Sequence, residues 1–165
     1  MKGFNEIINA WKNMGSSHEA AKELTLEQVE AFESIVNDDE SWEKMLEVFR
    51  RGRANDSWLA SDWPAGFDEL VLCAPLCKLV DWECALCHVG KRQNNFSCGN
   101  EDSLFGYIAV LISLDNKDLL KVHLQKIKQI LQNNNVFWDM KRHELYLNSG
   151  YSSDDFKPSD EFSNI

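Results

Sequence analysis

Apolar residues recur every three to four positions along most of this chain, which is the spacing of one buried face of an α-helix. The first stripe ends at Gly15 and consists of Phe4, Ile7, Ile8, Trp11 and Met14. A second stripe follows Thr25, which we expect to cap a helix with Gln28 as its capping-box partner. Ser41 is the expected cap of a third helix, which we expect Gly52 to end.

The apolar stretch at residues 67–89 contains Pro75. Proline removes a backbone donor and clashes with the preceding helical turn, so it is not expected deep inside a regular helix. The pattern therefore predicts either a kink at Pro75 or a new helix that has this proline in its first turn. Residues 53–66 and 90–102 are expected to be connections.

Two more helices are predicted in the second half of the chain. Asp102 or Ser103 is the expected cap of the first, which runs through residues 104–112. Asp115 is the expected cap of the second, and residues 133–135, all asparagine, are expected to end it. The buried stripe predicted for this second helix is Leu119, Leu120, His123, Leu124, Ile127, Ile130 and Leu131.

The helical pattern weakens toward the C-terminus. Residues 136–147 fit either a short hairpin or one last helix, and residues 149–165 are polar and acidic. A length of 165 residues suits one domain. We therefore predict a mainly α fold: a single-domain bundle of about six to seven helices over residues 1–148, with a loosely held tail at 149–165.

The net charge of −10 limits the classes of partner that this chain can bind. A nucleic-acid-binding protein needs clustered Lys and Arg to neutralise phosphates, and docking on an anionic membrane has the same requirement. We expect neither a nucleic-acid partner nor a membrane partner. Negative charge instead speeds the encounter with a basic protein.

Three observations indicate a cytoplasmic protein. Glu6 and Asn9 interrupt the only apolar stretch near the N-terminus that resembles a signal peptide. The longest apolar run, residues 104–114, is too short to span a bilayer. Five cysteines, an odd number, fit reduced thiols in a cytoplasm.

Four of those cysteines, Cys73, Cys77, Cys84 and Cys87, lie close together in the sequence. On one continuous helix they would lie within about 80° of one another. They would also be spread over about 21 Å along the axis, at about 1.5 Å per residue. A single metal ion would not reach all four in that arrangement.

The cysteines leave four interpretations open. They are small core residues, because free cysteine is among the most buried residue types. Alternatively, Cys84, Cys87, His88 and Cys98 hold zinc, which favours four sulfur or imidazole ligands. A disulfide from Cys98 to Cys84 or Cys87 is the third interpretation. The fourth is c-type haem, because residues 84–88 read C-x-x-C-H.

Nothing else in the sequence indicates an enzyme. It contains no nucleophile elbow, phosphate-binding loop, dinucleotide fingerprint or zinc-protease motif. His123 lies on an apolar stripe, where we expect a core histidine rather than a catalytic one. We predict that the chain is not an enzyme. A Cys–His pair that meets only in the fold is the remaining alternative.

Negative charge is concentrated between Glu19 and Glu47, where ten acidic residues stand against two lysines. Most of these carboxylates fall opposite the apolar stripe, so we expect an acidic outer face on the second and third helices. The alternative is an ordinary solvated face. If this face binds a basic protein, the predicted contact residues are Glu27, Glu30, Asp38, Asp39, Glu40 and Glu43.

Residues 84–90 (CALCHVG), Cys98 and residues 102–107 (DSLFGY) resemble segments of bacterial immunity proteins. Those proteins guard cells against polymorphic or contact-dependent toxins. The resemblance implies a protein that covers the active site or substrate groove of a cognate toxin. It implies neither a particular fold nor fixed binding residues, because these families share neither.

Overall fold

The computed structural model describes residues 4–13, 15–54, 74–93, 97–98 and 102–138. Within these ranges the chain forms α-helices and two short 3-10 turns, and no strand. The mainly α prediction is therefore confirmed. The elements are α1 (Phe4–Lys12), α2 (His18–Asn37), α3 (Asp39–Ala54), α5 (Ala74–Leu79), η1 (Cys84–Leu86), η2 (Gly90–Arg92), α6 (Gly106–Ser113) and α7 (Lys117–Gln132).

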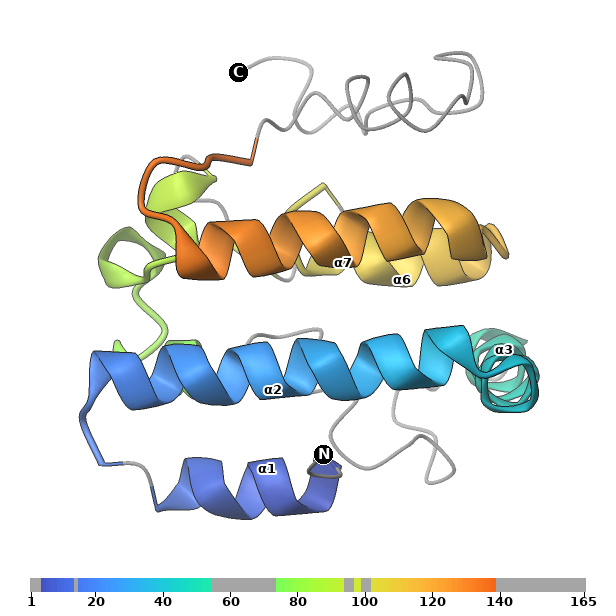
Figure 1. The fold of residues 1–165 in the computed structure, drawn as a ribbon, viewed down its shortest axis with the longest axis horizontal. Coiled ribbons are helices and arrows are strands. Elements are labelled where there is room, and N and C mark those ends of the chain that lie inside the picture. The colour runs from blue at the N-terminus through green and yellow to red at the C-terminus, as the bar shows by residue number, and fades with distance from the viewer. Residues whose placement is uncertain (1–3, 14, 55–73, 94–96, 99–101, 139–165) are drawn as a thin grey trace.

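Helix α2 is the centre of the arrangement (Figure 1). It contacts α1, α3, α5 and α7, while α6 packs against α3 and α7. In the view of Figure 1, α1, α2 and α7 lie in three rows, and α3 is seen along its axis at one end of α2. None of the described helices is both long enough and apolar enough to cross a membrane.

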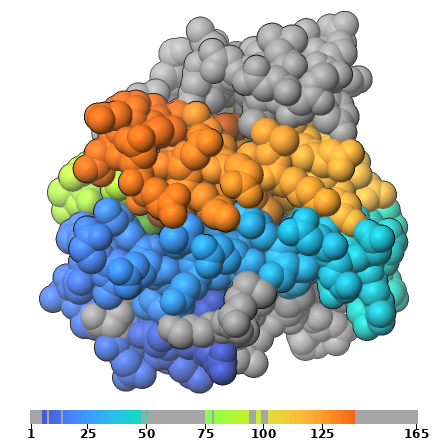
Figure 2. All heavy atoms as spheres, in the orientation of Figure 1, coloured from blue at the N-terminus to red at the C-terminus, as the bar shows by residue number. Residues whose placement is uncertain are grey.

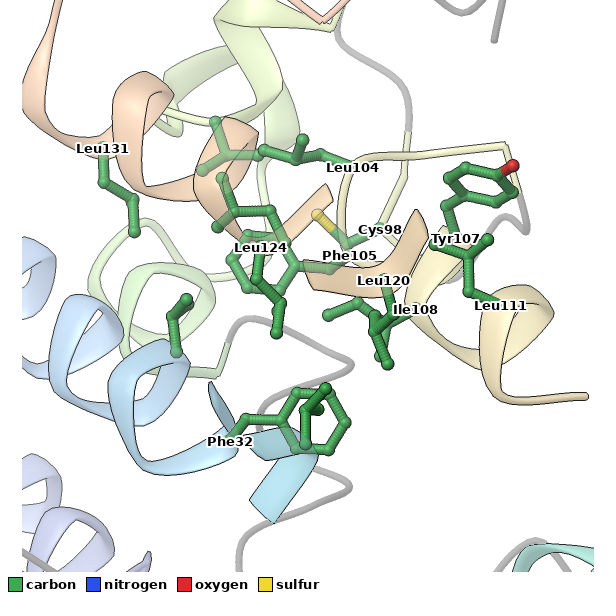
Figure 3. Close-up of a cluster of buried hydrophobic side chains, with 14 of the residues drawn as sticks. Phe32, Cys98, Leu104, Phe105, Tyr107, Ile108, Leu111, Leu120, Leu124 and Leu131 are labelled. Carbon is green, nitrogen blue, oxygen red and sulfur yellow. The ribbon is translucent and has the colours of Figure 1, made fainter. Parts of the chain in front are cut away.

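The core lies between α2 and the pair formed by α6 and α7. Phe32, Phe105 and Leu124 have no exposed surface and belong to one cluster of buried side chains, part of which is drawn in Figure 3. All seven positions predicted for the α7 stripe are buried. The buried face of α7 could be predicted from the sequence because a regular helix repeats its buried positions every 3.6 residues.

Helix α2 begins earlier than the sequence pattern predicted. Ser17 is its N-cap, and the Ser17 side chain accepts a hydrogen bond from the backbone N–H of Ala20 at 3.2 Å. Thr25 is buried inside the helix and donates its hydroxyl to the carbonyl of Ala21 at 2.8 Å. The predicted cap at Thr25 and its box partner Gln28 are therefore wrong, because both residues face the protein interior.

Helix α3 is capped by Asp38 and not by Ser41. One carboxylate oxygen of Asp38 accepts the backbone N–H of Ser41 at 2.9 Å and its hydroxyl at 2.6 Å. Ser41 therefore already lies in the first turn as a donor to the true cap. The predicted end at Gly52 is also wrong, because α3 continues to Ala54.

The remaining boundary predictions have mixed outcomes. Pro75 is the second residue of α5, which confirms the new-helix alternative. The predicted cap of α6 at Asp102 or Ser103 is wrong, because α6 begins at Gly106 with Phe105 as its N-cap; Ser103 accepts the backbone N–H of Gly106 at 3.0 Å in the turn that precedes the helix. Helix α7 is capped by Asn116 instead of Asp115, because Asp115 has a φ of 51° and lies in the tight turn before the cap.

The chain leaves α7 at Asn133 and continues without a strand to Trp138. Trp138 is buried. Its backbone N–H donates to the backbone carbonyl of Arg92 at 2.8 Å, and its indole N–H donates to the backbone carbonyl of Asp102 at 2.9 Å. The predicted hairpin or last helix at 136–147, the domain end at 148 and the acidic tail at 149–165 fall largely or wholly outside the described residues.

Candidate functional site

The acidic corner is the surface at the α2–α3 junction formed by Asp38, Asp39, Glu40 and Glu43, all of which are exposed. Asp38 has a structural role there, since its carboxylate caps α3 through Ser41. These hydrogen bonds to Ser41 are the main reason why the pKa of Asp38 lies below its ordinary value. Negative charge in this first turn is also favoured by the partial positive charge at a helix N-terminus.

Two carboxylates of the acidic corner form ion pairs at the surface. Asp39 pairs with Lys117 of α7 at 2.5 Å while remaining 94% exposed, and this contact lowers the pKa of Asp39. Glu40 pairs with Lys44 one turn along α3 at 2.8 Å. The Lys117 side chain is only 22% exposed, but both carboxylates stay largely exposed in these pairs and so remain accessible to another cation. Local spacing in the sequence gives no sign that Lys117 lies beside Asp39, because 78 residues separate them.

Glu27 and Glu30, the other two predicted contact residues, are only half-exposed and lie on α2 away from the corner. In Figure 2, α2 appears as a central band between α7 and α1. Glu33, on the same helix, pairs with Lys128 of α7 at 3.2 Å. The six predicted residues therefore separate into an exposed corner of four and a recessed pair.

A second candidate site is a pocket of about 200 Å³ beside α5 and the two 3-10 turns. Cysteine side chains from three separate segments line it. Together with apolar and small neighbours, the lining residues are Cys77, Val80, Trp82, Cys84, Cys87, Gly90, Ser97 and Cys98. We call Cys77, Cys84, Cys87 and Cys98 the thiol cluster; Cys73 lies outside the described residues.

The cysteines of the thiol cluster do not lie on one continuous helix. The chain turns after α5 at Asp81 and Trp82, which have φ values of 51° and 65°. Residues with positive φ cannot continue a right-handed helix, so Cys84 and Cys87 return toward Cys77. The spread worked out for one continuous helix therefore does not apply to Cys77, Cys84 and Cys87, and Cys98, distant in sequence, lines the same pocket.

Several N–H groups are directed at the sulfur atoms of the cluster. The neighbouring backbone N–H groups act to lower the thiol pKa, those of Gly90 and Val89 for Cys87 and that of Cys98 for Cys84. The amide of Gln93 donates to the Cys98 sulfur at 3.4 Å. Burial nevertheless raises the pKa of Cys77, Cys84 and Cys87. Raised pKa values argue against a nucleophilic thiolate, which needs a lowered pKa.

Gly90 allows the two 3-10 turns to pack closely. A Cβ atom at this position would lie 2.0 Å from the carbonyl oxygen of Cys84, far inside contact distance. Because the obstacle is backbone, a side chain at Gly90 would force η1 and η2 apart. Glycine here therefore holds Cys84 and Cys87 on the same side of the pocket.

His88 does not join the thiol cluster, although the sequence grouped it with Cys84, Cys87 and Cys98. Its Nε2 lies 2.7 Å from the carbonyl oxygen of Ile130 on α7, and burial is the main cause of its lowered pKa. His88 is therefore engaged with α7 instead of the pocket. As the described side chains are placed, no three His, Cys, Asp or Glu residues share a point where a metal ion could bind.

The other chemistry predicted for the cysteines finds little support in the described part of the chain. None of the four cysteines of the cluster is in a disulfide. The expected core position of His123 is confirmed: it is fully buried, with Nε2 2.6 Å from the Leu104 carbonyl oxygen. Its ring stacks edge-on against Tyr107 and Trp138, each at 5.0 Å between ring centres.

Comparisons with known proteins add no family to this picture. The sequence matches no family model, no curated protein and no solved structure. The acidic corner and the thiol cluster are therefore the features that bear on function.

Proposed function

We propose that this chain is a protein-binding module that neutralises a basic partner through the acidic corner, in the manner of an immunity protein. The partner would be a toxin whose cation-lined active site or substrate groove is covered on binding. The interaction would take place in the cytoplasm and would require no catalysis by this chain.

The observation that carries the proposal is the exposure of several carboxylates on consecutive turns at one end of the bundle. Asp39 is 94% and Glu40 78% exposed, and their lysine partners are held only by surface ion pairs. A basic partner can replace such lysines with its own cations at little cost. Complementary charge of this kind chiefly raises association rate and specificity.

Two reasons can account for the carboxylates of the acidic corner: binding of a partner and stabilisation of helix α3. Glu43 distinguishes between them. Asp38 caps α3, and Asp39 and Glu40 occupy its first turn, so the helix dipole accounts for all three. Glu43 lies beyond that turn, where the dipole effect has faded. A carboxylate at this exposed position supports the docking interpretation more directly than the other three.

The test is a pull-down from the native host with tagged wild-type protein, followed by affinity measurement on the captured basic protein. The informative variant is the double reversal Glu40→Lys/Glu43→Lys, because it leaves the Asp38 cap intact. The matched control is Glu23→Lys, a reversal at an exposed position of α2 away from the corner.

The proposal expects the double reversal to weaken binding of the basic protein by on the order of tenfold or more, as for rim charges that set encounter and register. Glu23→Lys should bind almost as the wild type does. Equal binding by the wild type and the double reversal would show that the acidic corner is not part of the interface. Capture of an acidic partner alone would contradict the proposed function.

A further inference from the structure

We propose that the pocket beside α5 is a binding site for a small uncharged aromatic molecule, which lies against the side chain of Trp82. The pocket has a volume of about 200 Å³, and its wall comes from α5, the two 3-10 turns and residues 97–98. A dry apolar cavity of about 150 Å³ in another protein accommodates benzene, so a pocket of this size admits a molecule with one ring.

The pocket lies away from the acidic corner. Helix α5 packs against α2, and Figure 1 shows the green segment at residues 84–92 near the beginning of α2, at the opposite end of that helix from α3. None of the described lining residues belongs to α2 or α3. The inference is therefore independent of the proposed function, because a ligand in this pocket leaves the acidic corner open to a protein partner.

The wall of the pocket is apolar and carries no formal charge. Val80, Trp82 and the thiol cluster supply most of it, and no charged side chain is among the described lining residues. Burial raises the pKa of Cys77, Cys84 and Cys87, so these sulfurs are neutral thiols at physiological pH. A charged ligand would lose its hydration here without gaining a counter-ion, so the wall selects an uncharged molecule.

The sulfur atoms favour an aromatic ring over an aliphatic molecule. Sulfur is soft and polarizable, and it makes favourable contacts with aromatic rings, often at the ring edge. The close packing at Gly90 holds Cys84 and Cys87 on the same side of the pocket, and Cys77 and Cys98 line it as well. The turns need not move to admit a ring, because the space is already present.

Trp82 is a second observation that points to a ligand. Its side chain lines the pocket, yet 60% of its surface is exposed. Aromatic rings pair with one another in offset or edge-to-face arrangements, which adds to the free energy gained from burial alone. A ring in the pocket would cover part of this indole and remove apolar surface from water.

The backbone holds Trp82 in this position under strain. Its φ of 65° lies in the left-handed region, which bulky residues rarely adopt and which glycine commonly occupies at the end of a helix. Two backbone hydrogen bonds fix the turn: the Trp82 N–H donates to the Cys77 carbonyl at 2.9 Å, and the Glu83 N–H to the Val80 carbonyl at 3.1 Å. Strained residues that the surrounding structure fixes in this way cluster at binding sites.

The experiment uses the full chain, labelled with nitrogen-15, and para-fluorophenol as the probe near neutral pH. The proposal expects the fluorine resonance of the probe to broaden and the indole N–H resonance of Trp82 to shift. The Trp82 resonance is identified by its absence from Trp82→Phe. The resonance of Trp138 should stay in place, because that indole is buried and bonded to Asp102. Para-fluorobenzoate, which has the same ring and a negative charge, should cause neither change.

The test variant is Trp82→Ala, and the matched control is Phe137→Ala. The two side chains are similarly exposed, at 60% and 59%, but Phe137 is not among the residues that line the pocket. Trp82→Ala should weaken binding of para-fluorophenol by on the order of fivefold, because the ring contact is lost. Phe137→Ala should bind the probe as the wild type does.

Trp82→Gly separates loss of the contact from loss of the fold. Glycine adopts the φ of this position without strain, so the variant should unfold at the same or a higher temperature than the wild type and still bind the probe weakly. Wild-type affinity in Trp82→Gly would contradict the site.

Three results on the other proteins would overturn the proposal. One is a wild-type Trp82 resonance that does not move up to the solubility limit of para-fluorophenol, and another is an equal response to para-fluorobenzoate. The third is a Trp82 resonance that moves when the protein alone is diluted, because a second copy of the chain would then cover the pocket.

Discussion

Gly90 shows how one residue can decide the shape of a site. Its lack of a side chain lets η2 approach the Cys84 carbonyl, which brings the two cysteines of the 84–87 turn to one pocket. The sequence pattern gave no sign of this, because the neighbour that restricts Gly90 is a backbone atom of another turn. Conformational demands of this kind follow from packing and not from local spacing.

Gly90→Ala should destabilise the protein by about 1–3 kcal/mol, the usual cost of forcing extra atoms into a closely packed site. The added methyl group would meet the Cys84 carbonyl, so the turns must separate. Chemical denaturation measures the change, with Lys91→Ala at the exposed neighbouring position as the control. Equal stability of Gly90→Ala and the wild type would show that the turns do not pack this closely.

Gln28 is a polar side chain that is fully buried on α2. Within the part of the chain that the structure describes, neither end of its amide has a hydrogen-bond partner. A buried polar group without partners costs about 1–3 kcal/mol. Gln28→Leu should therefore raise the free energy of unfolding. A fall in that free energy would mean that the amide is satisfied, for instance by ordered water.

At the scale of elements, the buried faces of helices were more predictable than their ends. The α7 stripe from Leu119 to Leu131 was read correctly because it repeats over four turns. Caps were missed where two suitable residues stand side by side, as at Asp115 and Asn116. The backbone decides between them, since the positive φ of Asp115 leaves Asn116 to accept the N–H of Leu119.

Leu124→Ala should cost about 2–5 kcal/mol of stability, because it opens a cavity in the core between α7 and α2. Leu124 has no exposed surface. Val122→Ala on the same helix is the matched control, since Val122 is 39% exposed, and should change stability by less than about 0.5 kcal/mol. Similar losses in the two variants, measured by urea denaturation, would contradict the assigned face of α7.

Asp38 links two elements, because it ends α2 and caps α3. Asp38→Ala should lower the unfolding midpoint near neutral pH, whereas Glu23→Ala, which removes an exposed charge but no cap, should not. The folded pKa of Asp38 lies below the ordinary 3.8, so its stabilisation is complete above that value and is lost as pH falls through the folded pKa.

The difference in stability between wild type and Asp38→Ala should therefore shrink as the pH is lowered below 3.8. Unfolding monitored by circular dichroism across the acid range measures this. A difference that stays constant at every pH would mean that the carboxylate does not act as the cap.

At the scale of the whole molecule, the sequence predicted the fold class and the concentration of charge but not how distant segments meet. Lys117 reaches Asp39 across 78 residues, and Cys98 joins the thiols near α5. Both contacts depend on how helices pack in three dimensions, which one-dimensional spacing does not contain. For the same reason Glu27 and Glu30 were expected on an open face but lie on a helix surrounded by α1, α5 and α7.

The most direct test of the central claim is the affinity of the captured basic partner for wild-type protein and for Glu40→Lys/Glu43→Lys at low and high salt. If the acidic corner forms the contact, wild-type binding weakens as salt rises, and the double reversal binds poorly at low salt and loses much of that salt dependence. Identical salt curves for the two proteins would contradict the account.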